Sequence, residues 1–114
     1  MEKDDSEVPD SNKMAPEPVT IINEICHYYQ VPSDEILKTR RGWWFNKPRN
    51  IAIYLIRLLR TEKLTAISDM FNMQLYSAVS SVIQRVGALR KKDKNIRKDI
   101  DIIIKNISKG QLKI

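Results

Sequence analysis

The sequence predicts an all-α domain, a compact bundle of about five to six helices that contains a helix-turn-helix. Three observations support this prediction. Apolar residues recur at intervals of three and four, strict polar/apolar alternation is absent, and the 114 residues include 3 glycines and no Asn-Gly turn. A chain of this length has room for one domain, so helices rather than hairpins must supply its core.

The first helix is expected at residues 19–30, where apolar residues recur on one face. It begins behind Pro18, with Thr20 as a candidate cap, and Pro32 ends it. The segment Ser33-Asp34-Glu35 then caps a single helical turn.

A basic loop at residues 38–47 leads into a helix at residues 48–61, which starts at Pro48. Most side chains of this helix are apolar, so we expect it to form the centre of the core. Its polar side chains fall within one arc of about 100° and should form a narrow basic stripe facing solvent. The stripe comprises Arg49, Asn50, Arg57 and Arg60.

A short helix and a tight turn follow, at residues 64–71 and 72–74. In this helix Ile67 and Phe71 should point inward, and Thr65, Ser68 and Asp69 outward. A longer helix at residues 75–92 completes the pattern of a helix-turn-helix.

The outer face of the longer helix is small and polar. Its inward set is Val79, Val82, Ile83, Val86 and Leu89, and its outward set is Ser77, Ser80, Ser81, Gln84 and Ala88. Small hydroxyl and amide side chains let a helix sink into a major groove about 12 Å wide and still bond to base edges. Similar faces also occur on ordinary solvated helices, so the charge of the chain has to decide.

A last helix is expected at residues 93–108, with a stop at Lys109-Gly110. Its inward set is Ile96, Ile100, Ile103, Ile104 and Ile107. The sequence therefore predicts a disordered acidic tail at residues 1–18, one domain at residues 19–109 and a short tail at residues 110–114.

The charge of the chain predicts a polyanionic partner. Residues 1–18 hold six acidic and two basic side chains, which leaves 18 basic and 8 acidic side chains, a net charge of +10, on residues 19–114. Cationic side chains bracket the helix pair, where phosphate contacts would arise. They are Lys63, Arg85, Arg90, Lys91, Lys92 and Lys94. The acidic tail is either solvated or a weak mimic of DNA charge that covers this basic face.

Several classes of function are excluded by composition. Cys26 and His27 are the only residues of their types, too few for a zinc site or a disulfide, and we expect them to be packing residues. No catalytic dyad, carboxylate pair or glycine-rich phosphate loop is visible, so we expect no enzyme, cofactor or small-molecule substrate. No membrane span or signal peptide is expected, and the predicted location is the cytoplasm, with the nucleoid.

These residues resemble the C-terminal duplex-binding domain of the bacterial replication initiator DnaA, over residues 19–109. The resemblance rests on Tyr28-Tyr29, Lys38-Thr39-Arg40-Arg41, Lys47-Pro48-Arg49 and the segment at residues 64–71, in the same order and at matching spacings. It implies a helix-turn-helix that binds double-stranded DNA in a sequence-specific manner.

The resemblance also implies roles for single residues. Arg41 would enter the minor groove, Arg49 and Arg57 would contact phosphates, and Leu64 and Thr65 would lie against the DNA. Together with the pattern above, the predicted base contacts are Arg41, Thr65, Tyr76, Ser77, Ser80, Ser81 and Gln84. The predicted phosphate contacts are Arg40, Lys47, Arg49, Arg57, Lys63 and Arg85.

The start of the recognition helix departs from the family. Leu75-Tyr76-Ser77-Ala78 stands where the family has Asp-His-Thr-Thr, so we expect a different binding site from that of the initiator. No nucleotide-binding loop is present, which indicates a DNA-binding module rather than an initiator.

A second resemblance is to the DnaA-like tail of tyrosine transposases of the REP-associated type. It rests on Arg41-Gly42-Trp43-Trp44, Pro48-Arg49 and the segment at residues 76–82. A chain with one histidine cannot build the metal site of those enzymes, so this resemblance implies a transposase-associated module without the nuclease.

The alternative function is a protein-interaction module that docks an acidic partner on its basic face. Trp43 or Trp44 would then supply an exposed anchor. The same side chains could instead wedge into the minor groove beside Arg41, or pack inward and hold the basic loop.

Overall fold

The computed structural model describes residues 15–37 and 47–112, which form six helices and no strand. The helices are α2 (Pro18–Tyr29), α3 (Ser33–Leu37), α4 (Lys47–Arg60), α5 (Leu64–Met70), α6 (Tyr76–Lys92) and α7 (Lys94–Leu112). The predicted all-α class is therefore confirmed.

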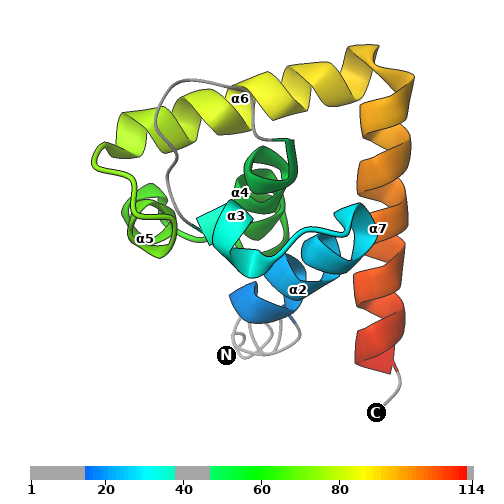
Figure 1. Ribbon diagram of the computed structural model, residues 1–114. Helices are drawn as coiled ribbons and strands as arrows, with labels where there is room; N and C mark the ends of the chain where they lie inside the picture. The colour runs from blue at the N-terminus through cyan, green and yellow to red at the C-terminus, as the bar shows by residue number, and fades with distance from the viewer. Residues whose placement is uncertain (1–14, 38–46, 113–114) are drawn as a thin grey trace, which may run out of the picture.

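Helix α4 lies at the centre of the bundle (Figure 1). It packs against α2, α3, α5 and α6, while α7 packs against α2 and α6. In Figure 1, α6 crosses the top of the molecule and α7 descends from its end, so the two longest helices form a corner around α4. None of the other five described helices covers the outer side of α6.

The core consists of aliphatic side chains from all six described helices, with Phe71, the C-cap residue of α5. Ile25, Ile53, Phe71 and Ile100, which come from four different segments of the chain, are each fully buried. The helix-turn-helix prediction is confirmed in the same way, because α5 and α6 pack together through their predicted inward faces.

Two polar residues lie inward, against the prediction. Asn50 on α4 is 6% exposed and Ser68 on α5 is 5% exposed. Leu58, an apolar side chain of the same helix, is 48% exposed. Arg49 is half-buried, so the predicted stripe along α4 is not a solvent-facing basic surface.

The ends of the chain also differ from the prediction. The N-cap of α2 is Glu17, and Thr20 lies inside the helix, so Thr20 is not its cap. Pro16 is buried, and its carbonyl oxygen accepts a hydrogen bond from Arg60 Nη1 at 3.0 Å, so the packed part begins before residue 19. Helix α7 continues through the predicted Lys109-Gly110 stop to Leu112.

Candidate nucleic-acid interface

Hydrogen bonds across the turn fix the relation between α5 and α6. The main-chain N–H of Met73 donates to the main-chain carbonyl oxygen of Ser68 at 2.9 Å. In return, the side-chain hydroxyl of Ser68 donates to the main-chain carbonyl oxygen of Met73 at 2.6 Å. Asn72 adopts a left-handed conformation with φ 56°, which an asparagine tolerates better than most residues. The turn is therefore held by its own polar groups rather than by glycine.

The predicted outer face of α6, which comprises Ser77, Ser80, Ser81 and Gln84 and is called the reading face below, lies on the side of the helix that the other described helices leave uncovered. Ser77, Ser81 and Gln84 are exposed, and Ser80 is half-buried. Val79 and Val86 are buried on the opposite side, which sets the rotation of the helix about its axis. The small polar side chains thus form one stripe that is accessible to a groove of DNA as far as residues 15–37 and 47–112 are concerned.

The start of α6 is apolar and exposed. Leu75, its N-cap, is 65% exposed and Tyr76 is 59% exposed. The sequence predicts a base contact for Tyr76, whereas the exposure of Leu75 is a feature that the structure shows. The signal was available, since a leucine at a helix cap has no turn of helix before it to cover its side chain.

Thr65 and Lys63 lie at the start of α5. Lys63 is the N-cap of this short helix, and both side chains are exposed. Arg85 on α6 is exposed as well. These three predicted contacts are all accessible to a ligand.

Two arginines of α4 are engaged inside the protein. Arg49 Nε donates to the oxygen of Ile36 at 3.2 Å, and its Nη2 donates to the oxygen of Phe71 at 2.9 Å. Burial lowers the pKa of this guanidinium from its ordinary value. Arg57 Nη1 donates to the oxygen of Glu62. Both side chains tie α4 to neighbouring segments, whatever further contact they make with phosphate.

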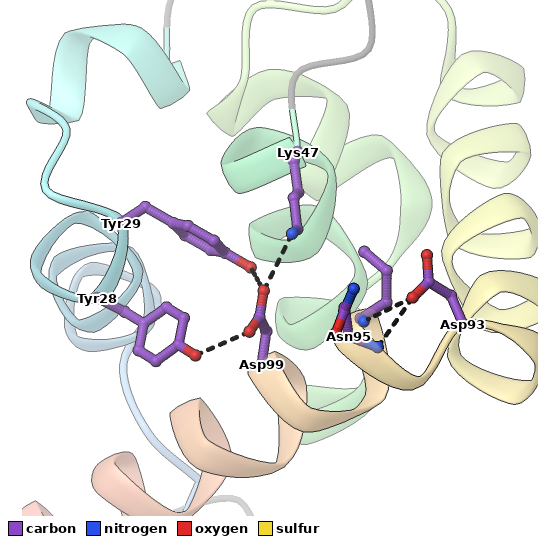
Figure 2. Close-up of polar contacts among 7 residues, drawn as sticks. Tyr28, Tyr29, Lys47, Asp93, Asn95 and Asp99 are labelled. Carbon is purple, nitrogen blue, oxygen red and sulfur yellow. Dashed lines mark hydrogen bonds and ion pairs between the residues drawn. The ribbon is translucent and has the colours of Figure 1, made fainter.

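Lys47, another cation of α4 with a predicted phosphate contact, belongs to a polar cluster around Asp99 (Figure 2). Lys47 Nζ lies 3.1 Å from Asp99 Oδ2, and the hydroxyls of Tyr28 and Tyr29 donate to the two oxygens of this carboxylate at 2.8 and 2.7 Å. Burial alone would raise the pKa of Asp99, but the hydrogen bonds from Tyr29, Tyr28 and Lys47 hold it below its usual value. The cluster joins α2, α4 and α7 at the point where α4 begins.

Four residues with predicted roles lie outside the described residues: Arg40, Arg41, Trp43 and Trp44. Their roles stay predictions. Within the described residues, no group of three or more His, Cys, Asp or Glu side chains could hold a metal ion. No helix there has the length and apolar character that crossing a membrane requires.

Comparison with known proteins identifies the chain's relatives. Residues 18–86 match the family model of the bacterial DnaA protein helix-turn-helix. A chromosomal replication initiator protein DnaA from Acholeplasma laidlawii is 32% identical over 89 residues, which cover 78% of this chain and 20% of that protein. The corresponding protein from Lactococcus lactis is 30% identical over 83 residues, covering 73% of this chain and 18% of the relative. The matching part therefore spans about a fifth of the length of these relatives.

Proposed function

The chain belongs to the bacterial DnaA helix-turn-helix family, and on this premise we propose that it binds one duplex DNA sequence in preference to others. DNA binding follows from membership in this family of helix-turn-helix domains. The sequence preference is our proposal, and the observation that carries it is the uncovered Ser/Gln stripe on α6.

The proposed complex has α6 in the major groove. Ser77, Ser81 and Gln84 each offer donors and acceptors to base edges, and their small size allows close approach. Lys63 and Arg85 would neutralise phosphates beside the groove, which supplies affinity without sequence information. The function is binding without a chemical step, and chromosomal DNA as ligand implies the nucleoid as its location.

Selection from random duplex DNA by the purified chain, read by sequencing at two salt concentrations, tests this proposal. A defined motif that is enriched at both concentrations supports base reading. No enrichment, with binding that disappears at moderate salt, contradicts it and favours the protein-interaction module instead.

Two variants of equal charge make the selection specific for α6. Ser81→Glu places a carboxylate on the proposed reading face, whereas Ser108→Glu places one on an exposed position of α7. We expect Ser81→Glu to abolish enrichment and Ser108→Glu to retain the motif of the unmodified chain. Equal enrichment by both variants would remove α6 from the interface.

The motif also addresses the process that the chain serves. The relatives reported above are replication initiators, and a motif like the initiator's own sites would support a role in replication. We propose a different motif, because Leu75 and Tyr76 replace two polar base-reading residues of the family. Such a motif would be consistent with the alternative role, that of a transposase-associated DNA-binding module.

A further inference from the structure

A hollow lies where the C-terminal half of α6 meets the first turns of α7. Tyr54 of α4 and Gln84 of α6 are among its lining residues, and Gln84 also belongs to the proposed reading face. Its charged lining residues are Arg90, Lys91, Lys92, Arg97 and Asp101. Four cations and one carboxylate give the hollow a net positive charge, and all five lie beyond residues 18–86 that match the family model.

Two arginines of the hollow are held in place by the protein. Arg90 Nη1 donates to the hydroxyl of Tyr54 at 3.1 Å, and its Nη2 lies 3.5 Å from Asp101 Oδ1. Arg97 donates through Nε to the oxygen of Arg90 at 3.1 Å and through Nη2 to that of Lys91 at 2.8 Å. Because these side chains are already ordered, binding an anion to them loses less conformational entropy.

The contacts of Arg97 also change the electrostatics of the end of α6. The last carbonyl groups of a helix carry partial negative charge and repel phosphate. Arg97 places a guanidinium on two of these carbonyls, which offsets that repulsion. Lys91 and Lys92 are exposed beside it and have no ion pair with any residue in the described ranges. The end of α6 is therefore a cationic surface with two uncommitted ammonium groups.

The position of the hollow relative to Gln84 identifies its ligand. Lys91 lies seven residues after Gln84, which is about 10 Å along the helix axis at about 1.5 Å per residue. A major groove is about 12 Å wide, so a side chain at its centre is about 6 Å from either phosphate edge. With Gln84 over the bases, the hollow reaches the sugar-phosphate backbone.

We propose that the hollow between α6 and α7 binds the sugar-phosphate backbone of duplex DNA at the edge of the groove that α6 reads. The proposal rests on the proposed function and extends the DNA-contacting surface beyond the helix-turn-helix. Lys91 and Lys92 neutralise phosphates there, and Arg90 and Arg97 set the shape and charge of the surface that receives them.

The test uses two double variants of the full chain with equal loss of charge. Lys91→Gln with Lys92→Gln alters the hollow, and Lys105→Gln with Lys109→Gln alters exposed lysines toward the other end of α7. Fluorescence anisotropy measures binding to the selected duplex between 50 and 200 mM salt. Each phosphate contact contributes about 0.9 to the slope of log affinity against log salt concentration. If the hollow variant loses two contacts, the unmodified chain exceeds it in affinity by a factor that is about tenfold larger at 50 mM than at 200 mM salt. The control variant should show less than half of this change in slope.

Neutral methylphosphonates in the backbone beside the selected site identify the ligand directly. We expect them to weaken binding of the unmodified chain and of the control variant, and to have no further effect on the hollow variant. Equal weakening of all three proteins overturns the proposal, as does a hollow variant with the salt slope of the control. If the unmodified chain shows no preference for the selected duplex over scrambled DNA, the proposed function itself fails, which is a separate result.

Discussion

The hydroxyl of Ser68 donates a hydrogen bond to the main-chain oxygen of Met73 across 2.6 Å and so closes the turn between α5 and α6. Ser68 is almost fully buried, so its hydroxyl has no access to water as an alternative partner. The bond sets how the reading helix leaves the core, since Val79 of α6 is buried against the same core.

Replacing Ser68 with alanine should therefore destabilise the domain. The half-buried oxygen of Met73 loses its side-chain donor, and a typical intramolecular hydrogen bond contributes about 0.5–1.5 kcal/mol. Urea denaturation followed by circular dichroism measures this loss. Ser81→Ala, at an exposed position on α6, serves as the control and should stay within about 0.5 kcal/mol of the unmodified chain. Equal stabilities of the two variants would show that the bond contributes nothing.

Asp99→Asn should loosen the junction of α2, α4 and α7. The change removes the charge that pairs with Lys47 and weakens the hydrogen bonds from Tyr28 and Tyr29, which are worth about 1.5–3 kcal/mol each when the acceptor is ionised. Some bonding to the amide oxygen persists, so we expect a total loss of about 2 kcal/mol in the free energy of unfolding. Asp101→Asn, more exposed on the same helix, should cost clearly less.

The same cluster predicts a pH dependence. The pKa of Asp99 is lower in the folded protein than its ordinary value of about 3.9, so its stabilisation is complete above that pH. This stabilisation is lost as the pH falls below about 4 and through the folded pKa. Asp99→Asn should therefore flatten the decline of stability with acid in this range. Parallel pH profiles of the two proteins, measured by urea denaturation, would exclude Asp99 as the titrating group.

The helices could be predicted from the sequence because each carries one apolar face. Val79 and Val86 fix the rotation of α6, so the outward placement of Ser77 and Gln84 followed from their spacing alone. Ser68 could not be placed in this way. A pattern of polar and apolar residues predicts an outward position for a serine. Ser68 is buried because its hydroxyl bonds to a main-chain oxygen, and such a partner cannot be predicted from the types of the residues.

The same limitation applies to the cations of the interface. Charge and resemblance predict a phosphate contact for Arg49, and this contact stays a prediction; the structure adds hydrogen bonds from its Nε and Nη2 to the oxygens of Ile36 and Phe71. Lys63 and Arg85 are exposed, as a phosphate contact requires, because they lie at the start of α5 and on the outer side of α6. Only the three-dimensional structure separates these two kinds of cation.

Lys63→Ala should weaken binding to all DNA sequences equally. A phosphate contact carries no base information, and its loss lowers the salt slope by about 0.9. Anisotropy titrations with the selected duplex and a scrambled one at several salt concentrations measure both effects, with Lys105→Ala as the matched control. A loss confined to the selected sequence would instead make Lys63 a base-reading residue.

Gln84→Ala should weaken binding to the selected DNA sequence only. A side-chain amide bonded to a base edge contributes about 1–3 kcal/mol of discrimination, so the variant should lose affinity for the selected duplex and keep its binding to scrambled DNA. Competition titrations between the two duplexes measure the ratio directly. Equal losses on both would assign Gln84 to the backbone surface rather than to base reading.

The exposed apolar start of α6 predicts which chemical group of the DNA it contacts. The side chain of Leu75 forms no hydrogen bonds and that of Tyr76 is apolar except for its hydroxyl, and the apolar group that a major groove offers is the methyl of thymine. Replacing thymine by deoxyuridine, which lacks only this methyl, should weaken binding about fourfold at each contacted position, as expected from about 0.8 kcal/mol per buried carbon group. Tyr76→Ala and Leu75→Asn should each reduce that penalty, because the missing methyl then has no apolar partner to lose. Uracil at positions outside the selected motif serves as the control. If uracil within the motif were bound as tightly as thymine, the start of α6 would lie outside the groove, and base reading would rest on the Ser/Gln stripe alone.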